Sequence, residues 1–209
     1  NIGSLAGIES PEQRFGMSGL PKVFALALRA LSRTDLGDFD GAHGDAQEAM
    51  RIAEVARHGF SIQGASFGLG CLYLAQGQLL LSREVLERAL AISRDEKHRF
   101  WLPALGPLQA LVLAELDRAA EAAEVLATTA RNLDDQRHGT FTLLTAAEVH
   151  LRVGRLEAAQ PLAELTLQRA RRKHERGFEA RALWLQAEIA VARDPADTRG
   201  AEALYRAAG

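Results

Sequence analysis

Cysteine is almost missing from this chain of 209 residues: Cys71 is the only one, so no internal disulfide can form. A single cysteine is typical of a reducing compartment, and we expect a cytoplasmic protein. No apolar run approaches the roughly 20 residues that span a bilayer, and no signal peptide is recognisable. The net charge of −2 and the sequence pI near 6.3 exclude the broad basic surface of most nucleic-acid-binding proteins. We therefore expect no direct contact with nucleic acids or membranes.

Aromatic residues are also scarce, at 6% of the chain, and the alternating pattern of β-strands is absent. Helix-forming residues are abundant, and an apolar period of about 3.6 residues continues almost unbroken from Pro21 onward. This pattern predicts an all-α protein whose helices come in pairs. The expected helices lie at about 22–35, 40–56, 62–75, 79–94, 103–116, 119–132, 140–152, 156–173, 178–192 and 199–208.

The residues that separate the two helices of a pair recur at intervals of about 40 residues. They are Gly37, Gly77, Asp117 and Gly154. Small or apolar residues follow each glycine at the same offsets: Ala42, Ala46, Ala49 and Met50; Ser82, Leu86, Ala89 and Leu90; Ala159, Ala163, Thr166 and Leu167. Small residues at fixed offsets are typical of helices that pack closely on their neighbours. The period therefore predicts a solenoid of repeated units.

The period divides the chain into a connector at 1–20 and five units at 21–60, 61–100, 101–138, 139–177 and 178–209. The fifth unit is incomplete, and the chain opens with Asn1 rather than Met. We expect a piece of a longer protein. An incomplete last unit also predicts an apolar edge at the C-terminal end, which would favour end-to-end self-association.

The second unit carries the clearest signature, with Leu69, Gly70 and Tyr73 on its first helix. This resembles the tetratricopeptide repeat, in which L-G-x-x-Y precedes small and large apolar positions on the second helix. The other units are degenerate at these positions; the first has Arg29, Ala30 and Arg33 there. The resemblance implies an all-α, tetratricopeptide-like α–α superhelix (a right-handed solenoid) of about five helical hairpins.

Units of about 40 residues are longer than the common tetratricopeptide repeat. They resemble the C-terminal regions of bacterial signalling proteins: class III adenylate or guanylate cyclases fused to a STAND-type ATPase, and LuxR-type activators similar to the maltose regulator. The segments that carry the resemblance are 12–21, 67–75, 176–190 and 193–207. In the cyclase–ATPase family the matching region is a non-catalytic helical tail. Neither ATPase nor cyclase motifs occur in this chain, so the resemblance implies a regulatory module.

The first helices of the units would line the concave face of such a solenoid, which is the expected binding surface. Its mixed aromatic and charged content suits a protein or peptide segment, including the parent chain's own ATPase domain. The expected contact residues are Phe67, Cys71, Leu74, Pro107, Leu111, Phe141, Leu144, Glu148, Arg152, Arg181, Trp184 and Glu188. A second interpretation stays open, in which the three aromatic residues of this set belong to the core of the repeats.

Three other patterns have ordinary structural interpretations. Ser66 is the centre of a G-x-S-x-G sequence, but a serine-hydrolase nucleophile needs a strand before it, and this segment lies inside an expected helix. Four histidines recur at the turns between units, where they are too far apart to share one zinc ion: His58, His98, His138 and His174. We interpret them as polar residues near helix C-termini. The basic run Arg169, Arg171, Arg172 and Lys173 is interpreted as a solvated helix end, with an anion-binding patch as the alternative.

The sequence therefore predicts a non-catalytic module that binds a protein or peptide and regulates a larger bacterial signalling protein. No metal and no cofactor are expected. One alternative is a small-molecule sensor domain of a STAND-type regulator, which would have a compact pocket instead of a long groove. A remote alternative is a serine hydrolase that uses Ser66.

Overall fold

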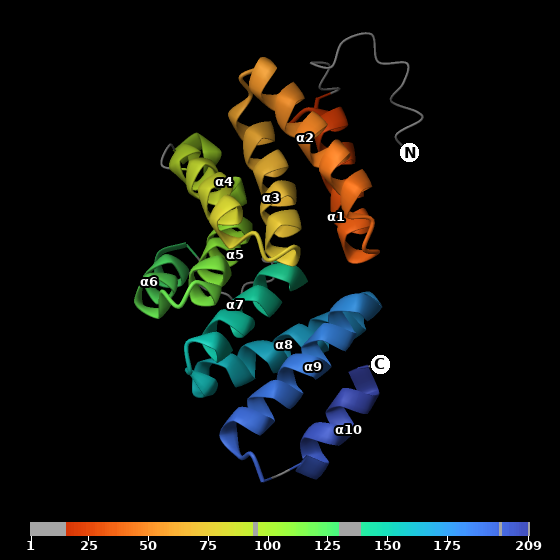
Figure 1. Ribbon diagram of the computed structural model, residues 1–209, viewed down its shortest axis with the longest axis vertical. Coiled ribbons are helices and arrows are strands. Elements are labelled where there is room, and N and C mark those ends of the chain that lie inside the picture. Colours follow the sequence, from red (N-terminus) through yellow and green to blue (C-terminus); the bar gives the residue numbers. More distant parts are fainter. Residues whose placement is uncertain (1–15, 94–95, 130–138, 197, 209) are drawn as a thin grey trace. The chain divides into compact units, whose positions relative to one another are not determined.

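The computed structural model describes residues 16–93, 96–129, 139–196 and 198–208, and all regular structure in these residues is helical. The expectation of an all-α protein is thus confirmed. The helices shown in Figure 1 are α1 (Pro21–Asp35), α2 (Phe39–Val55), α3 (Gly59–Ala75), α4 (Leu79–Ile92), the 3-10 helix η2 (Glu96–Trp101), α5 (Leu102–Glu115), α6 (Ala119–Thr129), α7 (Thr140–Arg152), α8 (Leu156–Lys173), α9 (Arg176–Arg193) and α10 (Thr198–Ala208). None of the described helices is long and apolar enough to cross a membrane.

All ten expected helices are present in the described residues, and their ends lie within a few residues of the prediction. The sequence did not predict η2, which occupies the stretch between α4 and α5 that we had interpreted as a simple turn. At the N-terminal end, residues 1–15 of the expected connector lie outside the described residues. Leu20 is buried and precedes α1, and Pro21 occupies the first helical turn, where its missing N–H is not needed.

The turns inside the first four pairs share one backbone conformation. Gly37, Gly77, Asp117 and Gly154 have φ angles of 77°, 70°, 59° and 73°. After each of them, the next backbone N–H donates to the carbonyl five residues earlier, at 2.8–2.9 Å. This is the Schellman ending of a helix, which needs a left-handed residue and therefore favours glycine. The periodic breakers in the sequence thus mark equivalent turns.

The chain divides into two compact units, Asn1–Leu105 and Gly106–Gly209. In the first unit α3 packs against α1, α2 and α4, so that α3 is covered on several sides. Buried residues of α1, α2 and α3 form two apolar clusters. One contains Leu20, Val23, Leu26, Ala49, Ile52, Ala53 and Ala65, and the other Ala30, Ala42, Ala46, Leu69 and Leu72.

Helices α3 and α4 approach closely at Gly70, as the tetratricopeptide-like signature suggests. A Cβ atom added at Gly70 would lie 2.7 Å from Cδ2 of Leu86 on α4. The Ser82 hydroxyl of α4 donates to the carbonyl of Gly70 at 2.8 Å. A larger residue at position 70 would force the two helices apart, because a contact of this length is shorter than packed atoms allow.

In the second unit α7 packs against α8 and α9, and α9 packs in addition against α8 and α10. Their shared core contains Leu144, Ala147, Ala159, Ala163, Ala182, Leu185 and Ile189. Helix α5 begins just before the division between the units, and Gly106 at that division faces Thr129 of α6 closely. The handedness of a superhelix and the five-unit division stay predictions.

Candidate binding face on α7 and α9

Helices α7 and α9 are neighbours and bring three of the expected contact residues together. Glu148 of α7 lies 3.7 Å from Arg152 on the same helix and 3.5 Å from Arg181 on α9, measured between carboxylate oxygens and guanidinium nitrogens. Arg152 also contacts Glu115 of α5 at 2.7 Å. Two acidic and two basic side chains from three helices of the second unit therefore form one charged network, which we call the Glu148 network.

The centre of this network is buried and its edges are exposed. The Glu148 side chain is 12% exposed, whereas those of Arg152 and Arg181 are 40% and 54% exposed. Burial raises the pKa of the Glu148 carboxyl above its ordinary value, and the two arginines oppose this rise. Arg152 is held by its short contact with Glu115, whereas Arg181 lies 3.5 Å from Glu148 and is held less tightly, so Arg181 remains available to an outside group.

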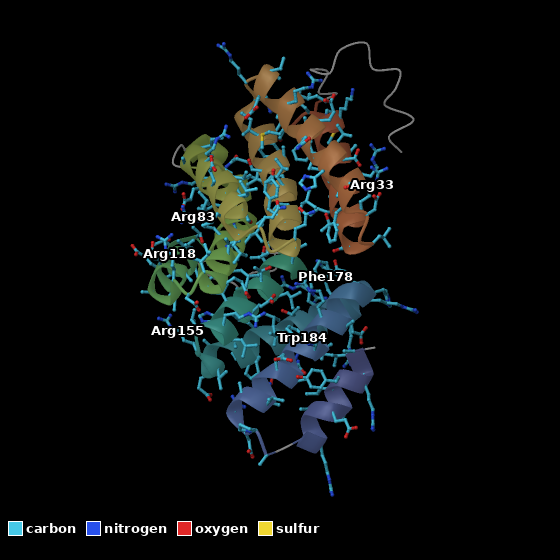
Figure 2. The ribbon with its side chains drawn as sticks, in the orientation of Figure 1. Arg33, Arg83, Arg118, Arg155, Phe178 and Trp184 are labelled. Carbon is cyan, nitrogen blue, oxygen red and sulfur yellow. The ribbon has the colours of Figure 1, made fainter. Side chains whose placement is uncertain are left out.

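Trp184 and Glu188 extend the same face of α9. They follow Arg181 by three and seven residues, a spacing that places all three on one side of a helix. Trp184, labelled in Figure 2, is 36% exposed and thus offers aromatic surface to solvent. Glu188 accepts a hydrogen bond from the Tyr205 hydroxyl of α10 at 2.6 Å, and this bond raises the pKa of Tyr205. The face therefore combines exposed cationic and aromatic groups with less exposed anionic ones.

Two expected residues on α7 are less accessible. Leu144 is only 2% exposed and belongs to the apolar core of the second unit. Phe141 is half-buried, and its backbone carbonyl accepts a hydrogen bond from Thr145. Leu144 is therefore a core residue beneath this face and exposes little surface to a ligand.

The expected contact residues nearer the N-terminus are dispersed. Phe67, Cys71 and Leu74 on α3 are half-buried, whereas Pro107 and Leu111 on α5 are buried. The Phe67 ring lies 5.8 Å from the ring of Trp101. This contact favours the interpretation of Phe67 as part of a structural aromatic cluster.

Sequence reasoning did not find that aromatic cluster. Its members come from α1, α3 and η2, with ring centroids 5.3–6.0 Å apart: Phe24, Phe60, Phe67, Phe100 and Trp101. A signal was present, because Phe60 and Phe100 are one repeat period apart in the sequence. The 3-10 helix that brings Phe100 and Trp101 to α3 had no recognisable pattern.

Ser66 does not lie in a nucleophile elbow. It is 2% exposed inside the continuous helix α3, so it is not raised on a strand-to-helix turn. The nearest candidate base along the chain, His58, contacts the hydroxyl of Ser61 through its Nδ1 atom at 3.0 Å. The G-x-S-x-G sequence is here a stretch of small residues that permits close helix packing.

The structure describes the side chains of two of the periodic histidines, His58 and His174. His58 lies just after the C-terminal end of α2, where its backbone N–H donates to the carbonyl of Ala53 at 3.1 Å, and its Nδ1 atom also caps the N-terminus of α3 by accepting the backbone N–H of Ser61. His174 does end α8, in the left-handed conformation with φ of 58°. His138 and the side chain of His98 lie outside the described residues. Across the described residues, no three His, Cys, Asp or Glu side chains are grouped as metal ligands.

The basic run at the end of α8 is partly neutralised. Arg169 is buried at 3% exposure, and Arg171 pairs with Glu179 at 2.8 Å. Lys173 lies 4.0 Å from Glu175. These contacts agree with a structural helix end.

Comparison with protein-family models, with curated proteins and with solved structures gives no significant match to this chain. The tetratricopeptide assignment therefore rests on the sequence pattern and stays a prediction, while the helical hairpins and their repeated turns are features of the structure itself.

Proposed function

We propose that this chain is a non-catalytic helical-repeat module of the tetratricopeptide type, which binds a protein or peptide segment and regulates a larger bacterial signalling protein. The observation that supports this most is the face of α7 and α9, where Arg152 and Arg181 flank the largely buried Glu148 carboxylate and Trp184 is exposed one helical turn beyond Arg181. Arginine and tryptophan are the residue types that most often dominate the free energy of protein–protein association.

The chemistry of this face favours a peptide with an acidic group next to an apolar or aromatic side chain. The acidic group would compete with Glu148 for Arg181, whose side chain is 54% exposed and whose guanidinium lies 3.5 Å from its present partner. The apolar side chain would cover Trp184. If the peptide binds one arrangement of the helices better than another, it increases the population of that arrangement. This shift would change the output of a neighbouring domain.

A random peptide library displayed on phage, selected against the immobilised 209-residue chain, tests the proposal. The best selected sequence is synthesised with a fluorescent label, and its dissociation constant is measured by anisotropy. The double variant Arg181→Glu with Trp184→Ala should weaken binding by about thirtyfold, the effect of losing interface hot spots. In the variant Trp101→Phe, Trp184 is the one remaining tryptophan. Its fluorescence emission should change when the peptide binds.

Two control variants test whether the loss of peptide binding is specific to the α7–α9 face. Arg199→Glu changes an exposed arginine of α10 outside the face and should leave the dissociation constant unchanged. Ser66→Ala should also bind normally, because Ser66 has no chemical role in this proposal. Equal binding by the double variant and the unsubstituted chain would refute the α7–α9 face as the binding site.

A further inference from the structure

The first unit contains a groove that the proposed peptide-binding face does not use. It lies between the C-terminal half of α2, the N-terminal half of α3 and the C-terminal half of α4, and its volume is about 520 Å³. Met50, Ile62, Val85 and Ile92 supply most of its apolar lining. This volume falls in the range of about 300–1,000 Å³ that is usual for sites of small organic ligands.

A small residue of α3 lines the groove. This residue is Ser66, and the equivalent position of the repeat in α9 is Leu183. Both residues are nearly inaccessible, at 2% and 5% exposure. A leucine in place of Ser66 would occupy part of the groove.

The rim of the groove is charged. Glu54 of α2 pairs with Arg88 of α4 at 3.1 Å, so this pair joins the two helices that flank the groove. Arg57 is a third charged residue of the lining, and among the described side chains it has no carboxylate within ion-pair distance. Among the described lining residues, Arg57 and Arg88 outnumber Glu54 by one positive charge, which suits a ligand with a single negative charge.

Apolar residues line both ends of the groove, and Arg57 lies at one of them. Helices α3 and α4 run in opposite directions, since Gln63 bonds to Ser93 while Gly70 bonds to Ser82. Arg57, just before the start of α3, is consequently at the same end as Ile92. Met50 and Val85 lie at the other end, next to Ser66. A ligand that fits must be charged at one end and apolar at the other.

We propose that this groove binds a linear aliphatic carboxylate, with the carboxylate at Arg57 and the hydrocarbon chain on Met50, Ile62 and Val85. Met50 lies on α2 and Arg57 follows the end of that helix, so the two residues line different ends of the groove. This ligand class belongs to the small-molecule alternative raised by the sequence. It depends on the first unit only and is independent of the proposed peptide-binding face.

The test is a calorimetric titration of the whole chain with saturated carboxylates of four to twelve carbons, below their micelle-forming concentrations. The association constant should increase by up to about fourfold per methylene and stop increasing when the groove is full. Decanol should bind more weakly than decanoate, and decyltrimethylammonium should bind most weakly. Equal binding by these three ten-carbon probes would show adsorption to apolar surface and would overturn the proposal.

Substitutions in and outside the groove test whether decanoate binds there. Arg57→Glu should weaken decanoate binding by about fivefold or more, as expected for reversal of an exposed charge next to the ligand. Arg99→Glu, on η2 and outside the groove, is the matched control and should bind normally. Ser66→Leu should abolish binding by filling the groove; if Ser66→Leu does not fold, Arg57→Glu still decides the question. Unchanged binding by Arg57→Glu would overturn the site.

A protein segment is the other possible occupant of a groove between helices. A synthetic acidic amphipathic helical peptide is therefore titrated in parallel. If the peptide binds in an Arg57-dependent manner and decanoate does not bind, the groove is a protein-docking site and the carboxylate proposal is wrong. Loss of binding in Arg181→Glu with Trp184→Ala would concern only the α7–α9 face.

Discussion

The first two hairpins, α1–α2 and α3–α4, have charged and apolar residues, respectively, at three equivalent positions. In the second hairpin Leu69 and Tyr73 of α3 belong to an apolar cluster that Val85 of α4 also contacts. At the equivalent positions of the first hairpin the chain has Arg29, Arg33 and Asp45. Arg29 donates two hydrogen bonds to Asp45, and Arg33 lies 3.1 Å from the same carboxylate. An ion triad thus replaces an apolar triad.

The comparison explains why the first hairpin, α1 and α2, forms without the tetratricopeptide-like signature. The three substitutions compensate one another: two guanidinium groups surround a carboxylate whose side chain is only 7% exposed. Arg33, labelled on α1 in Figure 2, also donates to the carbonyl of Gly41 at 2.9 Å. Degeneracy at the signature positions is therefore a coordinated change between two helices.

The largest expected effect comes from breaking this compensation. Arg29→Leu with Arg33→Tyr introduces the apolar residues of the second hairpin but leaves the Asp45 carboxylate buried without its arginines. We expect the free energy of unfolding to fall by about 3 kcal/mol, because a buried charge that loses its partners is strongly unfavourable. Urea denaturation followed by far-UV circular dichroism measures this change.

The control adds Asp45→Val to the same double variant, which completes the apolar triad. The triple variant should recover most of the loss and come within about 1 kcal/mol of the unsubstituted chain, since apolar replacements of buried ion pairs are often neutral or stabilising. A double variant that unfolds at the same urea concentration as the unsubstituted chain would contradict the role given to the triad.

Much of the fold followed from local sequence signals, and most of the interactions between helices did not. Glycine at a left-handed turn depends on one residue, so Gly37, Gly77 and Gly154 could be placed in advance. The pairing of Arg29 with Asp45 depends on two helices meeting in one register. Nothing at either position alone indicates it.

The candidate face shows the same limit. Helical spacing grouped Glu148 with Arg152, and alignment of the repeats put Arg181 next to them, which is where the structure has them. The spacing also selected Leu144, yet α8 and α9 both pack around α7 and bury that residue. Burial depends on how many neighbours surround a helix, which its own period does not reveal.

A smaller effect is expected at a second pair of positions that differ between the hairpins. Gly70 faces Leu86 in the second hairpin, whereas Ala30 and Ala46 occupy these positions in the first. Gly70→Ala should lower the free energy of unfolding by about 1 kcal/mol, because the strain against Leu86 exceeds the gain in helix propensity. Thermal and urea unfolding both measure the change.

Gly44→Ala is the matched control. Gly44 lies inside α2 with nothing within 4 Å of an added Cβ atom, so this substitution should stabilise the chain by about 0.5–1 kcal/mol. Combining Gly70→Ala with Leu86→Ala reproduces the small-residue pair of the first hairpin. The double variant should be more stable than the sum of the single effects predicts, and simple additivity would show that the two residues do not interact.

The smallest effect concerns the other buried carboxylate, that of Glu148, and distinguishes it from Asp45. Because burial raises the pKa of Glu148 in the folded state, the folded chain binds this proton more readily than the unfolded chain. The stability that results is present below the ordinary glutamate pKa and is lost as the pH rises through the raised value. Glu148→Gln removes the titrating group, so the unsubstituted chain should lose stability relative to this variant as the pH rises above the ordinary glutamate pKa. Urea unfolding at several pH values measures the difference.

A constant difference would mean that the two arginines keep Glu148 ionised as firmly as solvent does. Glu148 would then be held by its arginines as tightly as Asp45 is.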